Sequence, residues 1–134
     1  NSLFLIVFSL SATIFYFVLS FDRQNPAPVW FDSSLHFLGG VWLAAAFLYY
    51  IHTSRTAEFH LSGHFLSDLI VLLGVVALIG VLWEFYEYAI ALYAGIPSDP
   101  LDDTLGDLLA DLGGGLVLFL GYRLARTYLK KAKR

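Results

Sequence analysis

Four long apolar segments constrain this chain more than any other feature of its sequence. They cover residues 3–20, 34–51, 66–94 and 104–128. A helix needs about 20 apolar residues to cross the roughly 30 Å of hydrocarbon in a bilayer. Backbone groups in lipid must bond to one another, and the alternating pattern of barrel strands is absent, so helices remain. We expect an all-α, polytopic protein of a cell membrane, a single domain built as a bundle of four transmembrane helices.

The composition agrees with a membrane protein and excludes several function classes. Hydrophobic residues make up 58% of the 134 residues and charged residues only 14%, whereas a soluble domain has about a quarter charged. The net charge of −3 argues against a nucleic-acid partner, which needs a basic face. Because the chain has no cysteine, thiolate metal sites and thiol nucleophiles are excluded.

Polar breaks separate the apolar segments and suggest where helices begin. Residues 25–28 and 97–100 contain two prolines each, which cannot continue a helix. Ser33 and Asp102 or Asp103 have the side chains expected of N-caps for the second and fourth helices. The first segment has no basic region before it and no A-x-A-like site after it, so we predict a span rather than a signal peptide.

The basic residues predict an orientation. Of the eight Lys and Arg residues, four lie in the C-terminal tail and two more lie just inside it, while the loop before the fourth segment contains neither Lys nor Arg. By the positive-inside rule, both termini should be cytoplasmic and the proline-rich loops should be on the outer side.

Ionisable residues within the apolar segments are the candidates for function. They share a position toward the predicted outer ends of the helices, and they are His36, Glu84, Glu87, Asp107 and Asp111. At 1.5 Å per residue, Glu87 and Asp111 lie about 10 Å from the corresponding helix ends, and so at similar depth. An aspartate at mid-bilayer costs roughly 3 kcal/mol. We therefore expect these side chains to face one another rather than lipid.

A compact group of acids needs a cation or shared protons. Oxygen ligands with one imidazole suit Mg, Mn, Fe or Zn. The predicted divalent-metal ligands are Glu84, Glu87, Asp107, Asp111 and His36, with His36 alternatively acting as a catalytic general base. Asp32 and Asp103, near the same ends of their helices, are secondary candidates; for Asp103 a capping role is the simpler interpretation.

A second group, His60, His64 and Asp68, has a spacing of four. These residues would share one face, with metal-ligand spacing, if the third helix began early. The same histidines also fit an ordinary interfacial stretch with no special role.

Three short motifs carry a resemblance to a known family. The stretch DSSLHF at residues 32–37 resembles the D-K-x-x-H-F opening of VanZ-like membrane proteins. Together with WEFYE at 83–87 and DTLGDLLADLGG at 103–114, it is more similar to the YjdF-type family. The resemblance covers about residues 30–120 and implies a small bacterial inner-membrane protein with an acidic, histidine-containing core. Because Ser33 stands where the VanZ pattern has lysine, the link of VanZ relatives to glycopeptide resistance is not carried over.

Three functions remain open at this point. The leading hypothesis is a membrane protein with a buried divalent-metal site that opens to the outer leaflet. Such a protein could be a metal-dependent enzyme that acts on a lipid or envelope substrate. The alternative is a homo-oligomeric cation or proton transporter or channel, since intramembrane carboxylates commonly mark ion pathways. The third is a non-catalytic membrane subunit. Membrane lipid is the expected partner in each case.

Overall fold

The computed structural model describes residues 29–53 and 61–132, and every regular element in these two ranges is a helix. The helices are α2 (Val29–Thr53), α3 (Phe65–Ala94) and α4 (Leu101–Ala132). Each is long and apolar enough to cross a membrane. The prediction of an all-α fold is confirmed for the described residues, and the three helices have the length and composition that membrane spans require. The first predicted span, residues 3–20, lies outside the described residues, so the count of four and the cytoplasmic termini stay predictions.

The bounds of α3 agree closely with the sequence, which predicted residues 66–94. The helix ends where Gly95 adopts the left-handed conformation, with φ of 68°. The amide of Gly95 donates to the carbonyl of Leu92 at 3.3 Å, and that of Ile96 donates to Ala91 at 3.1 Å. These bonds satisfy carbonyls that a helix end otherwise leaves unpaired.

The predicted N-caps of the other two helices were wrong. α2 begins at Val29, so Ser33 lies inside it. α4 begins at Leu101, and the carbonyl of Pro100 accepts bonds from the amides of Asp103 and Thr104 at 3.1 and 3.2 Å. A proline beside a helix start loses nothing by lacking an amide, because the first amides have no partner within the helix. Each helix can therefore begin directly after its proline.

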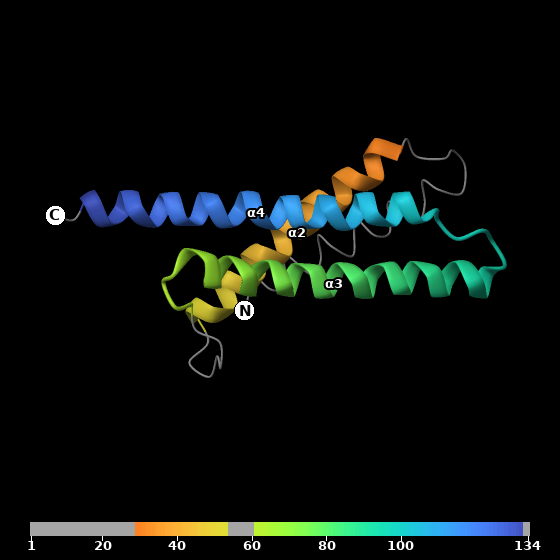
Figure 1. Cartoon of the computed structure of the whole chain (residues 1–134), viewed down its shortest axis with the longest axis horizontal. Coiled ribbons are helices and arrows are strands. Elements are labelled where there is room, and N and C mark those ends of the chain that lie inside the picture. Colours follow the sequence, from red (N-terminus) through yellow and green to blue (C-terminus); the bar gives the residue numbers. More distant parts are fainter. Residues whose placement is uncertain (1–28, 54–60, 133–134) are drawn as a thin grey trace. The chain divides into compact units, whose positions relative to one another are not determined.

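The chain divides into two compact units, Asn1–Asp32 and Ser33–Arg134. The second unit contains α3, α4 and α2 from Ser33 onward. In it α3 and α4 run antiparallel and side by side, and α2 crosses them obliquely (Figure 1).

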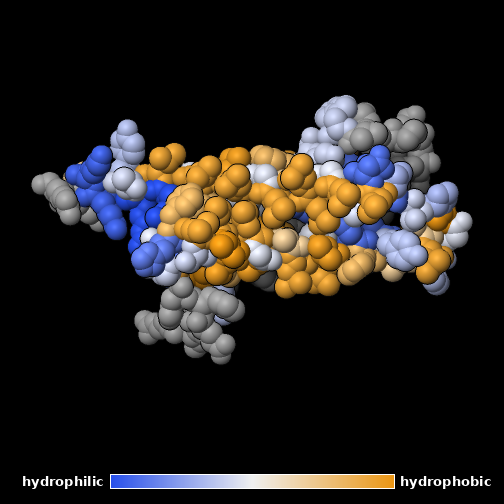
Figure 2. All heavy atoms as spheres, in the orientation of Figure 1, coloured by the Kyte–Doolittle hydropathy of each residue, from blue (hydrophilic) through white to orange (hydrophobic). Residues whose placement is uncertain are grey.

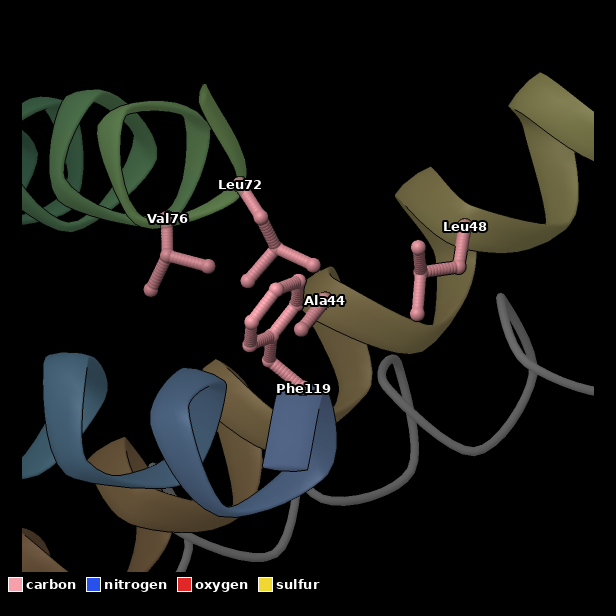
Figure 3. Close-up of a cluster of buried hydrophobic side chains, with 5 residues drawn as sticks. All are labelled: Ala44, Leu48, Leu72, Val76 and Phe119. Atoms are coloured by element: carbon pink, nitrogen blue, oxygen red, sulfur yellow. The ribbon is translucent and has the colours of Figure 1, made fainter. Parts of the chain in front are cut away.

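A small hydrophobic core joins the three helices of this unit. It consists of Ala44 and Leu48 from α2, Leu72 and Val76 from α3, and Phe119 from α4. Figure 3 shows the Phe119 ring between the other two helices, and its exposed fraction is 0%. This layer fills the middle of the bundle with apolar side chains.

Close contact between α2 and α4 depends on two glycines. A Cβ atom at Gly40 would overlap the backbone carbonyl of Asp111, and one at Gly114 would overlap the carbonyl of Phe37. The helices therefore touch backbone to backbone, as is common between membrane helices.

The outward surface of the helices is apolar. Large side chains such as Leu78, Leu82 and Leu109 are 53–71% exposed. On the face in Figure 2, hydrophobic residues cover the middle of the helices, and hydrophilic residues gather toward their ends. This distribution suits contact with lipid.

Candidate functional site

Three helices bring ionisable side chains to a similar level. Glu84 on α3 lies about 15 Å from the helix end at Ala94, and Asp111 on α4 lies about 15 Å from the start at Leu101. His36 lies about 10 Å from the start of α2. The side chains of His36, Glu84 and Asp111 are only 7, 12 and 6% exposed. Polar side chains from α2, α3 and α4 therefore lie close together within the second unit, as the sequence predicted.

The imidazole of His36 stands between two carboxylates. Its Nδ1 atom is 3.3 Å from Oδ2 of Asp111, and its Nε2 atom is 4.0 Å from Oε1 of Glu84. An ionised carboxylate can only accept a hydrogen bond, so with Asp111 ionised the ring proton lies on Nδ1 and Nδ1 donates a hydrogen bond to Asp111. In the neutral ring, Nε2 then presents its lone pair toward Glu84.

The position of Asp111 depends on glycines in both neighbouring helices. A Cβ atom at Gly80 on α3 would lie 2.6 Å from Oδ2 of Asp111. One at Gly39 on α2 would lie 3.7 Å from Oδ1. Gly40 approaches the backbone of the same residue. The Asp111 side chain therefore occupies space that these glycines leave.

One buried oxygen of Glu84 has no hydrogen-bond partner in the part of the chain that the structure describes. Thr104 on α4 hydrogen-bonds to this carboxylate. The Oε1 atom, however, is fully buried and has no hydrogen-bond partner among the described residues. Leaving a buried polar atom unpaired is costly, and such an atom in a native protein is often explained by an ion or water.

Asp107 lies one helical turn before Asp111 and has a different partner. The hydroxyl of Ser33 on α2 donates to Oδ1 of Asp107 at 3.0 Å. The Asp107 residue is 4% exposed. This bond is a second polar link between α2 and α4.

A group of three side chains has the spacing of metal ligands. One ligand atom from each of His36, Glu84 and Glu87 lies within 4.8 Å of the other two. A cation about 2.1 Å from each ligand would place pairs of ligand atoms roughly 3–4.2 Å apart. Side-chain adjustments of under an ångström would close the observed group around an ion.

Two predicted secondary ligands, Asp103 and Asp32, are not members of this group. Asp103 is in the first turn of α4, where a carboxylate favours the helix dipole. Asp32 is in the first turn of α2 and belongs to the first compact unit. The roles assigned to the five main candidates stay predictions.

Two neutral residues bond to these acids but were not predicted as part of the site, namely Ser33 and Thr104. A signal for both was present in the spacing. Ser33 lies three residues before His36, and Thr104 lies three before Asp107, so each shares a helix face with the candidate that follows it.

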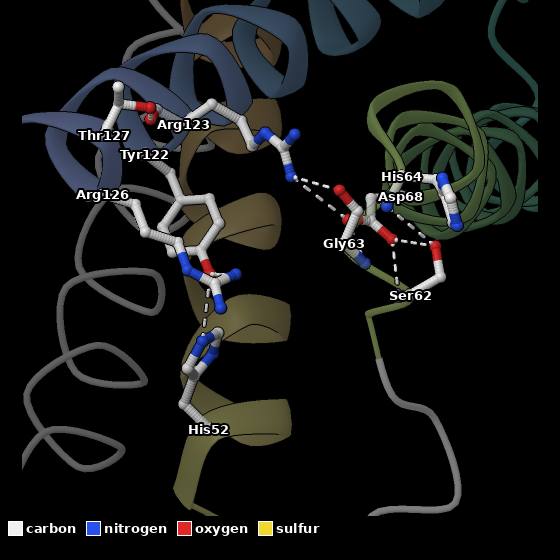
Figure 4. A network of polar contacts seen from close by, with 9 residues as sticks. All are labelled: His52, Ser62, Gly63, His64, Asp68, Tyr122, Arg123, Arg126 and Thr127. Atoms are coloured by element: carbon white, nitrogen blue, oxygen red, sulfur yellow. Dashed lines mark hydrogen bonds and ion pairs between the residues drawn. The ribbon is translucent and has the colours of Figure 1, made fainter. Parts of the chain in front are cut away.

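A shared face of His60, His64 and Asp68 required an early start of the third helix, but α3 begins at Phe65. His60 lies outside the described residues, and His64 is exposed in front of the helix. Asp68 instead accepts from the amide and hydroxyl of Ser62 at 2.8 and 2.9 Å and from the amide of Gly63 at 3.2 Å (Figure 4). Asp68 thus fixes the loop before α3.

The comparisons with known proteins are sparse. No curated protein and no solved structure matches the chain. The specific likeness to YjdF-type and VanZ-like proteins therefore stays a prediction, while membership of a membrane-protein family is confirmed. The sequence matches the family described as "Predicted membrane protein (DUF2238)" over residues 2–127, nearly its whole length, and the chain belongs to that family.

Proposed function

We propose that this protein binds a divalent cation within the membrane, through Nε2 of His36 and the carboxylates of Glu84 and Glu87. The observation that carries the proposal is the approach of one ligand atom from each residue to within 4.8 Å of the others. The residues come from two helices, so binding would also join α2 to α3.

The hydrogen bond of His36 supports a ligand role. Metal-binding histidines almost always donate their second N–H to a carboxylate or carbonyl, which fixes the ring and its tautomer. The 3.3 Å contact from Nδ1 to Asp111 has this arrangement. We therefore assign Asp111 to positioning His36. Since Nε2 cannot hold a cation and accept a proton at once, the ligand role replaces that of general base.

The buried oxygen of Glu84 is a second support. A cation bound beside it would supply the partner that Oε1 lacks among the described residues. It would also offset the repulsion between Glu84 and Glu87, which lie one turn apart on α3. Both costs of burying these acids fall when an ion is present.

The ligand set favours a first-row ion. One imidazole with two carboxylates suits Mn, Fe or Zn better than Mg or Ca, which prefer oxygen ligands alone. Three protein ligands leave a coordination position for water or a substrate atom, as in catalytic zinc sites. If the site is catalytic, we propose that the bound ion acts on a lipid or envelope substrate.

A transport function has less support. At the level of Asp111, the close contacts at Gly40 and Gly114 bring α2 against α4. Closer to the C-terminal end of α4, the buried core around Phe119 fills the space between the helices of this unit. Ion passage would need a path between copies of the chain. A pocket for an ion therefore fits the second unit better than a pore.

Metal analysis of the purified protein tests the proposal. Wild type supplied with Zn, Mn, Fe and Mg in turn should retain a stoichiometric amount of at least one first-row ion, and Glu84→Gln should lose it. Asp102→Asn is the matched control, because it also neutralises a carboxylate, at an exposed position in the first turn of α4. Metal-free wild type under all four conditions would show that the proposal is wrong.

A further inference from the structure

The opposite end of the same unit contains a basic pocket. Its volume is about 140 Å³, roughly ten times the 10–15 Å³ that one water requires. The lining residues come from the end of α4 and the loop before α3, and they are Gly63, Arg123, Arg126, Thr127 and Lys130. None of them belongs to the proposed cation site.

The spacing on α4 builds the basic wall. Arg123, Arg126, Thr127 and Lys130 follow one another at intervals of three, one and three residues, so they share one helix face. Three of the four are cationic. The Thr127 hydroxyl donates to the carbonyl of Arg123 at 2.9 Å and so stays close to the helix.

Arg123 is held in place by the loop and start of α3. Its Nη1 atom donates to the carbonyl of Gly63 at 3.2 Å and lies 3.4 Å from Oδ2 of Asp68. Its guanidinium also lies over the ring of Phe65, 5.8 Å from the centroid. Figure 4 shows this side chain reaching across from α4 to the loop. The charge of Arg123 is thus matched by Asp68.

Arg126 and Lys130 provide the excess positive charge. Nη1 of Arg126 donates to the hydroxyl of Tyr122 at 3.3 Å, and that hydroxyl is 3.0 Å from Nε2 of His52 on α2 (Figure 4). A guanidinium has five N–H donors in a planar fork, so this bond orients Arg126 while leaving donors for a ligand. With Arg123 matched, the pocket carries two net positive charges.

The level of the pocket along α4 indicates the source of a ligand. From Leu101 to Arg123 the helix rises about 33 Å, close to the roughly 30 Å of hydrocarbon in a bilayer. If the start of α4 lies at one interface, the pocket lies among the headgroups of the other leaflet. The neighbouring Leu124 and Leu129 are 65 and 64% exposed, so apolar surface for an acyl chain adjoins the basic residues.

We propose that this pocket binds the phosphate group of an anionic phospholipid, with Arg126 and Lys130 as its principal contacts. Guanidinium and ammonium groups bind phosphate through charge-assisted hydrogen bonds. Basic pockets beside transmembrane helices have the chemistry that such headgroups require. A general attraction of the basic tail to the membrane surface would not depend on which lysine is changed. Binding in the pocket would depend on the lysine that lines it.

Two adjacent lysines make a matched pair for the test. Lys130 lines the pocket and Lys131 does not, although both are exposed at the end of α4. The delipidated full-length protein would be titrated with phosphatidylglycerol or phosphatidylcholine in detergent, and bound lipid counted by native mass spectrometry. We expect tighter binding of phosphatidylglycerol, weakened about fivefold by Lys130→Gln or Arg126→Gln. Lys131→Gln should change it less than about twofold.

Two results would overturn the proposal. Equal weakening by Lys130→Gln and Lys131→Gln would show that only general surface charge attracts the lipid. A separate titration with inorganic phosphate identifies the source of the anion. If inorganic phosphate binds in a Lys130-dependent manner and phosphatidylglycerol does not bind, the lipid assignment is wrong. Equal unfolding temperatures of the two lysine variants would confirm that binding is compared between equally folded proteins.

Discussion

Gly40 on α2 lies directly against the backbone of Asp111 on α4, so that a single added carbon at Gly40 would overlap the Asp111 carbonyl. The side chain of the same aspartate holds Nδ1 of His36, one turn earlier on α2. The closest contact between these helices and the hydrogen bond at the candidate site therefore share one residue. Helix packing and site geometry should respond together to substitution here.

Gly40→Ala tests this coupling. The added methyl must push α2 away from α4, and overpacking of this kind costs about 1–3 kcal/mol. We expect a lower unfolding temperature in detergent and weaker metal binding, because His36 moves with α2.

Gly74→Ala is the control for that substitution. Nothing lies within 4 Å of a Cβ at Gly74. Alanine has the better helix propensity by about 1 kcal/mol, so stability should stay equal or rise, with unchanged metal binding. Equal destabilisation of both variants would mean that the α2–α4 contact is not tight.

Asp111→Asn separates a positioning role from a ligand role. The amide oxygen can still accept from Nδ1 of His36, but the charge that strengthens the imidazole as a ligand is gone. Loss of such an outer partner costs about 10–100-fold in metal affinity. Titration calorimetry should therefore give weakened binding with unchanged stoichiometry, in contrast to Glu84→Gln. Complete loss of metal in Asp111→Asn would instead favour direct ligation.

Helix positions were largely predictable from the sequence because bilayer thickness sets the length of each apolar segment. The third segment was placed to within one residue of α3. The starts of α2 and α4 were placed too late, since Ser33 and Asp103 have the residue types of caps. Each helix instead begins directly after a proline, and composition alone does not distinguish a capping serine from one that bonds to a neighbouring helix.

The level of the acidic side chains along their helices was predictable, but the contacts between these side chains were not. Counting residues from the predicted helix ends placed Glu87 and Asp111 at one level, and Glu84 lies one turn from Glu87. The contacts between the carboxylates and the two nitrogens of His36 depend on the rotation and crossing angle of α2. The close contacts at Gly40 and Gly114 determine this orientation. The spacing of His64 and Asp68 implies a shared helix face only if the helix includes His64, and α3 begins one residue later.

Asp68→Ala should destabilise the protein more than any change at His64. Asp68 is 2% exposed, and it accepts three hydrogen bonds from the loop and pairs with Arg123. Leaving a buried hydrogen-bonding group without its partner costs about 1–3 kcal/mol, and two backbone amides and the Arg123 guanidinium would lose their acceptor. Thermal unfolding in detergent should show a large decrease for Asp68→Ala.

His64→Ala is the matched comparison for Asp68→Ala. The His64 side chain is exposed and forms no cap bond to α3, so its loss should leave the unfolding temperature nearly unchanged. Neither substitution should alter the metal content of folded protein. Loss of a bound ion in His64→Ala would restore the hypothesis of a second metal site.

Labelling of single cysteines tests the orientation and the number of spans. The chain has no cysteine of its own, so each introduced thiol is the only one present. Asp99→Cys lies in the exposed loop between α3 and α4, and Lys131→Cys lies near the basic end of α4. Because basic residues remain cytoplasmic, a membrane-impermeant maleimide should label Asp99→Cys in intact cells and Lys131→Cys only after permeabilisation. Ser2→Cys should behave like Lys131→Cys if the chain crosses four times, and labelling of Ser2→Cys in intact cells would show an odd number of spans.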